Sequence, residues 1–213
     1  MIVRKASTLG HLDVGWISSK RTFSNNSYWD PSYRRWKSLR VINDDCQLPG
    51  NMVPKHRHDA FDILGYMVQG ELEHWDSLGN VNRASAGQIQ HMHCGSGIYH
   101  TEASVGTVPA RYLQLWVINP NFKEAVKEEP HYELIDKNPE FGLIPITFKS
   151  GMKISGGILN GEHILPTKSA YIYIVSGCLI TNDITLYEND GAELDSDLIA
   201  NFNNCHLLMF EQD

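Results

Sequence analysis

The stretch PGNMVPKHRHDAFDILGYMVQGELEHWDSLGN, residues 49–80, contains the pattern that decides the fold. The apolar run DILGYMV is followed by the turn signal Gln69-Gly70 and then by the alternating segment ELEHW. Two such segments joined by a short glycine turn are typical of a β-hairpin. The histidine pair His56 and His58 comes directly before this hairpin, at a spacing of i and i+2.

The same alternation of strand and turn continues outward from the hairpin. SLRVIND precedes it, and VNRAS, QIQHMH, IYHTEA and RYLQLWVI follow it, with turn residues between them. Residues 1–40 alternate polar and aromatic groups, which indicates short strands and loops. Turn signals recur roughly every 8 to 12 residues, and helical periodicity is almost absent. The sequence therefore predicts an all-β sandwich or barrel.

The composition shifts after residue 118, where NPNFKEAVKEEPHYELIDKNP is charged, contains prolines and is poor in strand formers. We expect a linker here, with room for one short helix around FKEAVKEE. Beyond it, strands return, and AYIYIVSG stands where DILGYMVQG stands in the first half, which suggests a duplicated barrel unit. The predicted organisation is an N-terminal barrel at 1–118, a linker at 119–140 and a C-terminal barrel at 141–213.

Charge and composition exclude several classes of protein. The 213 residues include 25 acidic and 18 basic ones, giving a net charge of -7, which argues against direct binding of nucleic acid. No apolar window approaches the roughly 20 residues of a membrane span, and the start lacks the apolar core of a secretory signal. We therefore expect a cytoplasmic protein without membrane association. The four cysteines form no CxxC pair, so neither a zinc knuckle nor a disulfide framework is indicated.

A second pair, His100 and Glu102, lies on the segment IYHTEA at the same spacing as His56 and His58. Side chains at i and i+2 of a strand point to the same face, so two facing pairs can converge on one ion. Imidazole nitrogens with one carboxylate suit a borderline divalent metal and leave coordination positions open for substrate or dioxygen. These four residues are therefore the predicted metal ligands.

The order and spacing of these motifs resemble the pirin family of two-barrel cupins. The resemblance covers roughly residues 22 to 120 and rests on TFSNNSYWDP, LRVINDD, the stretch at 49–80, SAGQIQHMHCGSGIYHTEAS and LQLWVINP. It implies a bicupin, in which two β-barrels of the double-stranded β-helix type follow in tandem. The C-terminal barrel is expected to be degenerate and ligand-free, because Lys168-Ser169-Ala170 stands where an HxH pair would be.

The resemblance further implies that His56, His58, His100 and Glu102 hold one metal ion inside the N-terminal barrel. Fe(II) is the metal that the family suggests, while Cu, Ni, Mn and Zn remain alternatives because these ligand types tolerate several metals. Asp62 falls where the family carries an acid outside the ligand set, so we expect it to orient a ligand histidine.

One segment departs from the family pattern. His91, His93 and Cys94 stand where pirins usually have a tryptophan, a threonine and an alanine, and Ser96 replaces an arginine. The pair His91 and His93 is open to two interpretations, a rearranged ligand set or a hydrogen-bonded strand. Cys94 is likewise either a redox-sensitive thiol or a small packing residue.

Two functions follow from the resemblance, and the sequence leaves open whether the protein is an enzyme. The first is an iron- and dioxygen-dependent oxidoreductase of the quercetin 2,3-dioxygenase type, in which Glu102 is both ligand and catalytic base for a small planar phenolic substrate. The second is a non-enzymatic iron-dependent redox sensor or regulatory cofactor that binds a protein partner, which the altered segment 91–96 favours. We expect one or two aromatic side chains to line a substrate cavity, among Tyr66, Trp75, Tyr99, Tyr112 and Trp116.

Overall fold

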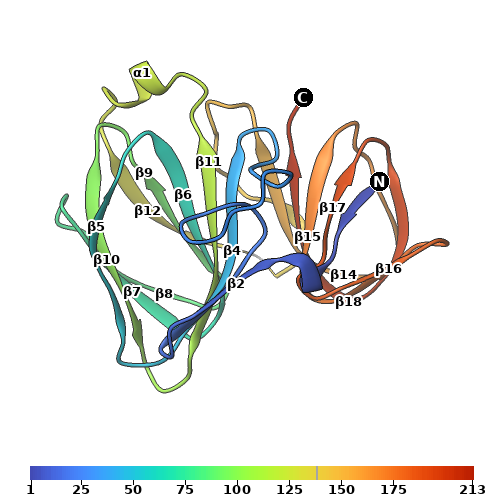
Figure 1. Ribbon diagram of the computed structural model, residues 1–213, viewed down its shortest axis with the longest axis horizontal. Coiled ribbons are helices and arrows are strands. Elements are labelled where there is room, and N and C mark those ends of the chain that lie inside the picture. Colours follow the sequence, from blue (N-terminus) through green and yellow to red (C-terminus); the bar gives the residue numbers. More distant parts are fainter. Residues whose placement is uncertain (138) are drawn as a thin grey trace. The chain divides into compact units, whose positions relative to one another are not determined.

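The computed structural model describes residues 1–137 and 139–213, and nearly all of its regular structure is β-strand (Figure 1). The predicted all-β class is therefore confirmed. The chain divides into two compact units. Residues Gly10–Lys137 form what we call the N-terminal unit, and Met1–Leu9 together with the residues from 139 onward form the C-terminal unit.

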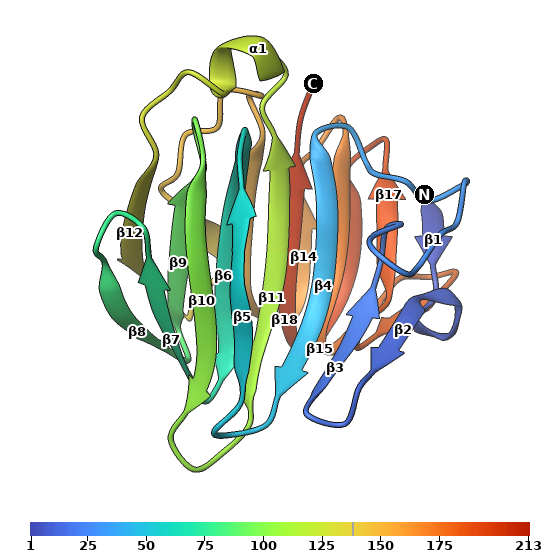
Figure 2. The ribbon, with the colours of Figure 1, turned by 60° about the vertical axis from the view of Figure 1, so that its left-hand side comes forward.

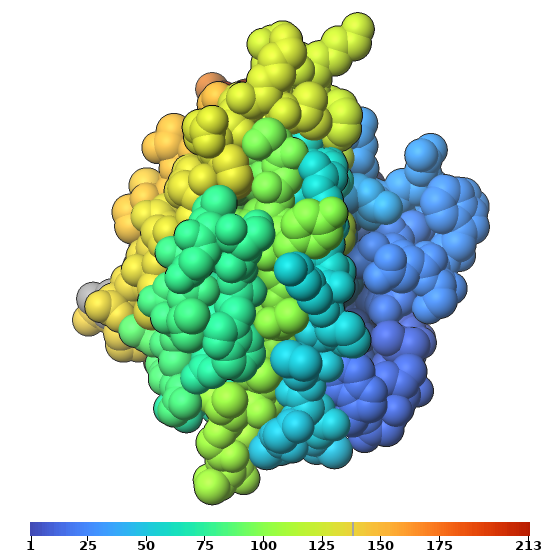
Figure 3. Space-filling model, turned by 90° about the vertical axis from the view of Figure 1, so that its left-hand side faces the viewer, coloured from blue at the N-terminus to red at the C-terminus, as the bar shows by residue number. Residues whose placement is uncertain are grey.

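The N-terminal unit consists of two antiparallel sheets and one short helix. Its strands and helix are β2 (Gly10–Asp13), β3 (Ile17–Arg21), β4 (Leu39–Gln47), β5 (Met52–His58), β6 (Phe61–Gln69), β7 (Glu71–Asp76), β8 (Val81–Ser85), β9 (Gln88–His93), β10 (Ile98–Val105), β11 (Ala110–Ile118), α1 (Phe122–Ala125) and β12 (His131–Asp136). One sheet has the order β12-β9-β6-β11-β4-β3-β2 and the other β5-β10-β7-β8 (Figure 2). Figure 3 shows the outer surface of the second sheet, with β5 in cyan, β10 in lime green and β7–β8 in green.

The predicted hairpin is the pair β6 and β7, joined at Gly70. This glycine has a φ of 71°, and an added side chain would collide with the backbone of Pro109. Only glycine meets both demands without strain. Apolar side chains from both sheets fill the interior, for example Met67 with Leu72, and Met92 with Ile98. Each such side chain contributes about 1.5–3 kcal/mol when it is fully buried.

The C-terminal unit is built on a single antiparallel sheet around its own apolar core. Its elements are β1 (Ile2–Arg4), the 3-10 turn η1 (Ala6–Thr8), β13 (Gly142–Leu143), β14 (Lys153–Leu165), β15 (Ala170–Ile180), β16 (Thr185–Tyr187), β17 (Gly191–Leu194) and β18 (Leu198–Glu211). The order is β1-β17-β15-β18-β14-β13, and β16 also pairs with β15.

The strand order of the two units agrees with the inferred duplication. In the N-terminal unit β9-β6-β11-β4 are consecutive neighbours, and in the C-terminal unit β17-β15-β18-β14 have the same relation. β12 extends the first series beside β9, and β1 extends the second beside β17. In each unit an outer strand thus pairs with backbone N–H and C=O groups that would otherwise be exposed at the edge of the sheet.

These outer strands explain where the observed division differs from the predicted boundaries. The first nine residues belong to the C-terminal unit, where Ile2–Arg4 pair with β17, although we assigned 1–118 to the N-terminal barrel. The predicted linker at 119–140 contains α1, as expected, but also β12, which pairs along its whole length with β9. Residue 138 of that linker lies outside the described residues. Composition alone did not reveal β12, because only Tyr132 and Leu134 of this short strand alternate toward the apolar clusters and charged residues surround them.

Among the described helices, none combines the length and the apolar character that crossing a membrane would require.

Candidate metal centre

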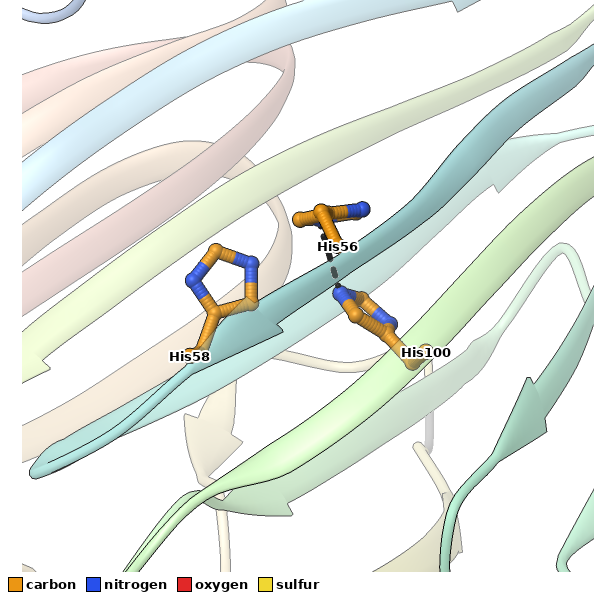
Figure 4. Close-up of side chains that lie close together, drawn as sticks. All are labelled: His56, His58 and His100. Atoms are coloured by element: carbon orange, nitrogen blue, oxygen red, sulfur yellow. Dashed lines mark hydrogen bonds between the residues drawn. The ribbon is translucent and has the colours of Figure 1, made fainter.

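The strands β5 and β10 are antiparallel neighbours, and their pairing gathers three predicted ligands. His100 lies directly opposite His56, while His58 follows on the same face of β5 (Figure 4). The Nε2 atoms of His56 and His100 are 3.0 Å apart. The ring of His58 lies 4.7 Å from that of His56 and 5.2 Å from that of His100. One ligand nitrogen from each of the three histidines lies within 4.8 Å of the others, so they form a group that could hold a metal ion.

The distance between the two Nε2 atoms suits a shared ion. Metal–nitrogen bonds of about 2.0–2.1 Å at a right angle place two nitrogens roughly 3 Å apart. His56 is oriented for this role because its Nδ1 donates a hydrogen bond to the carbonyl oxygen of Pro54 at 2.9 Å. Its Nε2 lone pair therefore points toward His100, as a metal ligand requires.

His100 is oriented from the opposite side by a chain of two residues on β7. The Nε2 of His74 donates to the Asp76 carboxylate at 3.0 Å, and the Nδ1 atoms of His74 and His100 are 3.5 Å apart. Asp76 in turn accepts hydrogen bonds from the backbone of Leu78 and Asn80. This arrangement directs the Nδ1 proton of His100 toward His74 and leaves its Nε2 for a metal.

Sequence reasoning missed the role of His74 and Asp76 beside His100. The available signal was the i, i+2 pair of His74 and Asp76 on the strand opposite His100. Strand pairing cannot be read from one sequence, so the sequence did not show that this pair lies beside His100.

Burial keeps His58 and His100 neutral. Burial and the neighbouring His56 lower the pKa of His58 to about 4. Burial, followed by the effects of His56, His58 and His74, lowers the pKa of His100 to about 2. Neutral imidazoles carry the lone pair that coordinates a metal, so no proton has to be removed from these two rings at neutral pH.

Glu102, the fourth predicted ligand, lies beside His100 but outside the histidine trio. The β5–β10 register shifts between His100 and Glu102, so Glu102 faces Val53. Its carboxylate groups with His100 and His74, and its Oε2 accepts a hydrogen bond from the Nε2 of Gln114 at 2.9 Å. A β-bulge redirects side chains in this way, and its position was not evident from the i, i+2 spacing. Coordination by Glu102 therefore remains a prediction.

Glu102 forms part of a buried acidic pair. Burial and the nearby Asp45 raise the pKa of Glu102 to about 7, although the Gln114 hydrogen bond opposes this shift. Burial also raises the pKa of Asp45 on β4 to about 7. Two carboxyl groups with such pKa values exchange protons near neutrality, which is the range that acid-base catalysis at physiological pH requires.

In metal-free protein, Asp45→Asn is expected to gain stability relative to the wild type as the pH rises from 4 to 8. The folded-state pKa of Asp45, about 7, lies above its ordinary 3.8, so the folded protein loses stability as pH rises through this window. Asparagine removes that loss, which amounts to a few kcal/mol at about 1.4 kcal/mol per pKa unit. Denaturant unfolding of EDTA-treated protein at both pH values measures the change. Asp183→Asn, at an exposed position, is the control variant. An equal difference between Asp45→Asn and the wild type at both pH values would contradict the assignment.

A cavity of about 320 Å³ opens on this site within the N-terminal unit. Its size falls in the ordinary range for small-molecule sites. His56, His58 and Glu102 contribute to its wall. The remaining lining residues come mainly from β2, β3, β4 and β11, namely Leu12, Val14, Trp16, Ile17, Ser19, Arg21, Asn25, Asn26, Asn43, Asp45, Val53, Pro54, Tyr112, Gln114 and Trp116. Of the aromatics we expected near a cavity, Tyr112 and Trp116 line this one, and Trp16 is an addition that sequence reasoning missed.

The departures from the family pattern lie away from this cavity. Asp62 accepts hydrogen bonds from His91 at 3.0 Å and His93 at 2.9 Å, so it orients these residues and not a member of the histidine trio as we expected. None of the described lining residues comes from the segment 91–96. Cys94 is fully buried, and burial raises the pKa of its thiol, which favours the packing interpretation.

Comparison with known proteins places this site in a family context. Residues 2–117, more than half of the chain, match the family described as Pirin. The chain belongs to the pirin family. Among curated pirin relatives, a quercetin 2,3-dioxygenase of Escherichia coli K12 is 39% identical over 89% of this chain and 87% of that protein. A pirin-like protein of Caulobacter vibrioides is 30% identical over 93% of each chain.

Solved structures extend the likeness to both units. Bacterial pirin YhhW from Escherichia coli, solved in complex with nickel(II), has a TM-score of 0.91 and 26% identity, and the match covers 99% of this chain and 97% of that one. The predicted pirin-like bicupin fold is thus confirmed.

The variant Asp76→Asn is expected to weaken metal binding by about 10–100-fold, the usual effect of removing a partner that orients a ligand histidine. Asparagine can still accept the backbone hydrogen bonds of Leu78 and Asn80, but it no longer offers His74 a charged acceptor. Competition with a calibrated chelator measures the affinity, and Asp183→Asn is the matched control. Unchanged affinity in Asp76→Asn would exclude the orienting role.

Proposed function

We propose that this pirin-family protein is a metal-dependent dioxygenase that cleaves a small planar phenolic substrate of the flavonol type. One observation carries the proposal. The cavity of about 320 Å³ has two histidines of the trio and the Glu102 carboxyl together in its wall. A metal ligand set and a proton-accepting group thus face the same space, which is the arrangement that activation of a phenol beside a metal requires.

The donor set fits a divalent transition metal. Three imidazoles beside a carboxylate suit a borderline metal ion, and the 3.0 Å between the Nε2 atoms of His56 and His100 matches two ligands on one ion. We propose that His56, His58, His100 and Glu102 hold the ion and that it is Fe(II). The nickel complex of YhhW and the dioxygenase name of the 39% identical relative support metal chemistry of this kind.

The protein's own residues would bind the substrate and move its proton. Tyr112, Trp116 and Trp16 offer apolar surface for a planar ring system. Glu102, with its pKa raised to about 7, would accept the proton of the flavonol hydroxyl, and Gln114 would hold the carboxylate in place. A bound divalent metal would supply Lewis-acid activation of the flavonol and a template that brings it together with dioxygen.

The alternative of a non-enzymatic, protein-binding redox sensor rested on the altered segment 91–96. Since this segment contributes no described residue to the cavity lining, the observation that favoured the sensor no longer applies. A cytoplasmic location is kept as part of the proposal, and cell fractionation would test it.

The test is anaerobic reconstitution with Fe(II), followed by addition of quercetin and then of dioxygen. We expect loss of the flavonol absorbance, with one dioxygen consumed and one carbon monoxide released per flavonol. Omission of metal should abolish turnover. A metal-loaded protein that neither binds nor consumes the flavonol would refute the enzyme, and a change in protein-partner affinity on iron oxidation would then favour the sensor.

A further inference from the structure

The pattern of the candidate metal centre occurs a second time in the N-terminal unit. His91 and His93 form an HxH pair on β9, as His56 and His58 do on β5. The neighbouring strand β12 carries His131-x-Glu133, just as β10 carries His100-x-Glu102. β9 and β12 are antiparallel neighbours at the edge of their sheet (Figure 2), with His131 opposite His93 and Glu133 opposite His91.

These four side chains share the face of β9 and β12 that points away from the core. The intervening residues Met92 and Tyr132 pack in the apolar cluster of the unit. Because successive side chains of a strand alternate between faces, the histidines and Glu133 lie on the opposite side. His131 and Glu133 are exposed, whereas His91 is buried. The cluster is therefore accessible from solvent on the side of β12 and buried on the side of β9.

The contacts within the cluster are those of potential ligands. The Nδ1 of His91 is 2.8 Å from Glu133 Oε1. The ring of His131 lies 5.6 Å from that of His91 and stacks on His93 at 5.1 Å. One ligand atom from each of His91, His131 and Glu133 lies within 4.8 Å of the others.

Asp62 on β6 gives this cluster the supporting group that metal-bound histidines usually have. Its Oδ1 accepts from the Nε2 of His91 and from the Nδ1 of His93. A carboxylate on one imidazole nitrogen fixes the ring and directs the other nitrogen to a metal. His93 also pairs with Glu128 at 3.0 Å through its other nitrogen, so it supports the cluster while His91 offers its Nδ1.

We propose that His91, His131 and Glu133 form a second metal site on the outer face of the N-terminal unit, which we call the outer site. It takes one borderline divalent transition-metal ion such as Zn²⁺, with water completing the coordination. Two imidazoles and one carboxylate select such an ion over Ca²⁺ or Mg²⁺, which prefer oxygen ligands. Asp62 and His93 act as positioning residues.

Ion entry requires little rearrangement of these residues. The ion takes the place between His91 Nδ1 and Glu133 Oε1, whose 2.8 Å separation is close to the roughly 3 Å between neighbouring ligands on one metal. The ion also joins β12 to β9 by side chains, in addition to their backbone ladder. Binding should therefore fasten an edge strand.

Zn²⁺ titration of the metal-free, full-length protein tests the outer site. A competing chelator is present throughout, so that only specific binding is counted. We expect two equivalents for the wild type, one for His131→Ala and one for Glu133→Gln. The variant His56→Ala/His58→Ala should lose the inner equivalent and keep the outer one.

The substitutions are chosen to leave the fold intact, because His131 and Glu133 are exposed whereas His91 and Asp62 are buried. His163→Ala, which replaces a partly exposed histidine of the C-terminal unit, is the matched control and should retain both equivalents. Wild-type protein that binds a single equivalent, lost in His56→Ala/His58→Ala, would overturn the outer site. So would two equivalents retained in both His131→Ala and Glu133→Gln. Neither result depends on catalysis, so the dioxygenase proposal is tested separately.

Discussion

Replacement of His100 by alanine is expected to remove metal binding at the inner centre and, with it, all dioxygenase turnover. His100 has two roles there. Its Nε2 faces the Nε2 of His56 at 3.0 Å, and its Nδ1 faces His74. Alanine removes a ligand as well as the end of the Asp76–His74 chain. The affinity loss should exceed the roughly 100-fold upper limit for orienting residues, since a direct ligand is lost.

The measurement is Fe(II) or Zn²⁺ affinity by chelator competition. It is best made in a His131→Ala background, so that an ion at the outer site does not contribute. His163→Ala is again the control, because His163 is a partly exposed residue of the C-terminal unit whose Nε2 donates a hydrogen bond to the backbone oxygen of Asn160. Circular dichroism should show an unchanged fold for both variants. Retention of a tightly bound inner metal by His100→Ala would rule out the proposed ligand set.

The strands of the N-terminal unit could be predicted because their sequence signals are local. The apolar run before Gly70, the glycine turn and the alternating segment after it correspond to β6 and β7. The histidine trio followed from equally local information, since the i, i+2 spacing on two strands needs only the assumption that the strands are neighbours. The register of β5 and β10 satisfies that assumption at His56 and His100.

The remainder of the site depends on pairing between distant segments. The bulge after His100 changes the position of Glu102, and no single-strand pattern announces a bulge. The cavity wall includes Trp16, which lies in the connection between β2 and β3 at the edge of the sheet. The pairing of His91 and His93 with Asp62 likewise follows from the register of β6 and β9. These features required the three-dimensional arrangement.

The domain boundary illustrates the same limit. β1 and β12 occupy corresponding places in the two units, yet each is separated in sequence from the strand that it pairs with. Composition indicated a linker because charged residues are common in 119–140. An edge strand tolerates such residues, since one side of it faces solvent. β1 precedes the N-terminal unit in the sequence but pairs within the C-terminal unit, and β12 follows the main strands of the N-terminal unit but pairs within it. Composition alone does not show such pairing, so it does not place the boundary.

Glu102→Gln is expected to lower the turnover number with the flavonol by about 10²–10⁴-fold, the usual contribution of a positioned general base. Glutamine preserves the size of the side chain and can keep a hydrogen bond with Gln114, but it cannot accept the substrate proton. Because Glu102 is also a proposed ligand, activity must be expressed per bound metal. Glu162→Gln, on an exposed part of β14, is the matched control.

The pH profile separates a base from a residue that only shapes the cavity. Burial and Asp45 raise the pKa of Glu102 to about 7, so the base becomes competent as pH rises toward neutrality. Wild-type turnover should therefore increase with pH along a limb at or below about pH 7, since a bound cation shifts this pKa downward. In Glu102→Gln that limb should disappear and the residual rate should be flat. If Glu102→Gln keeps the wild-type turnover per bound metal, or if its pH limb persists, the proton transfer belongs to another group. Asp45, in the same cavity wall, is then the next candidate.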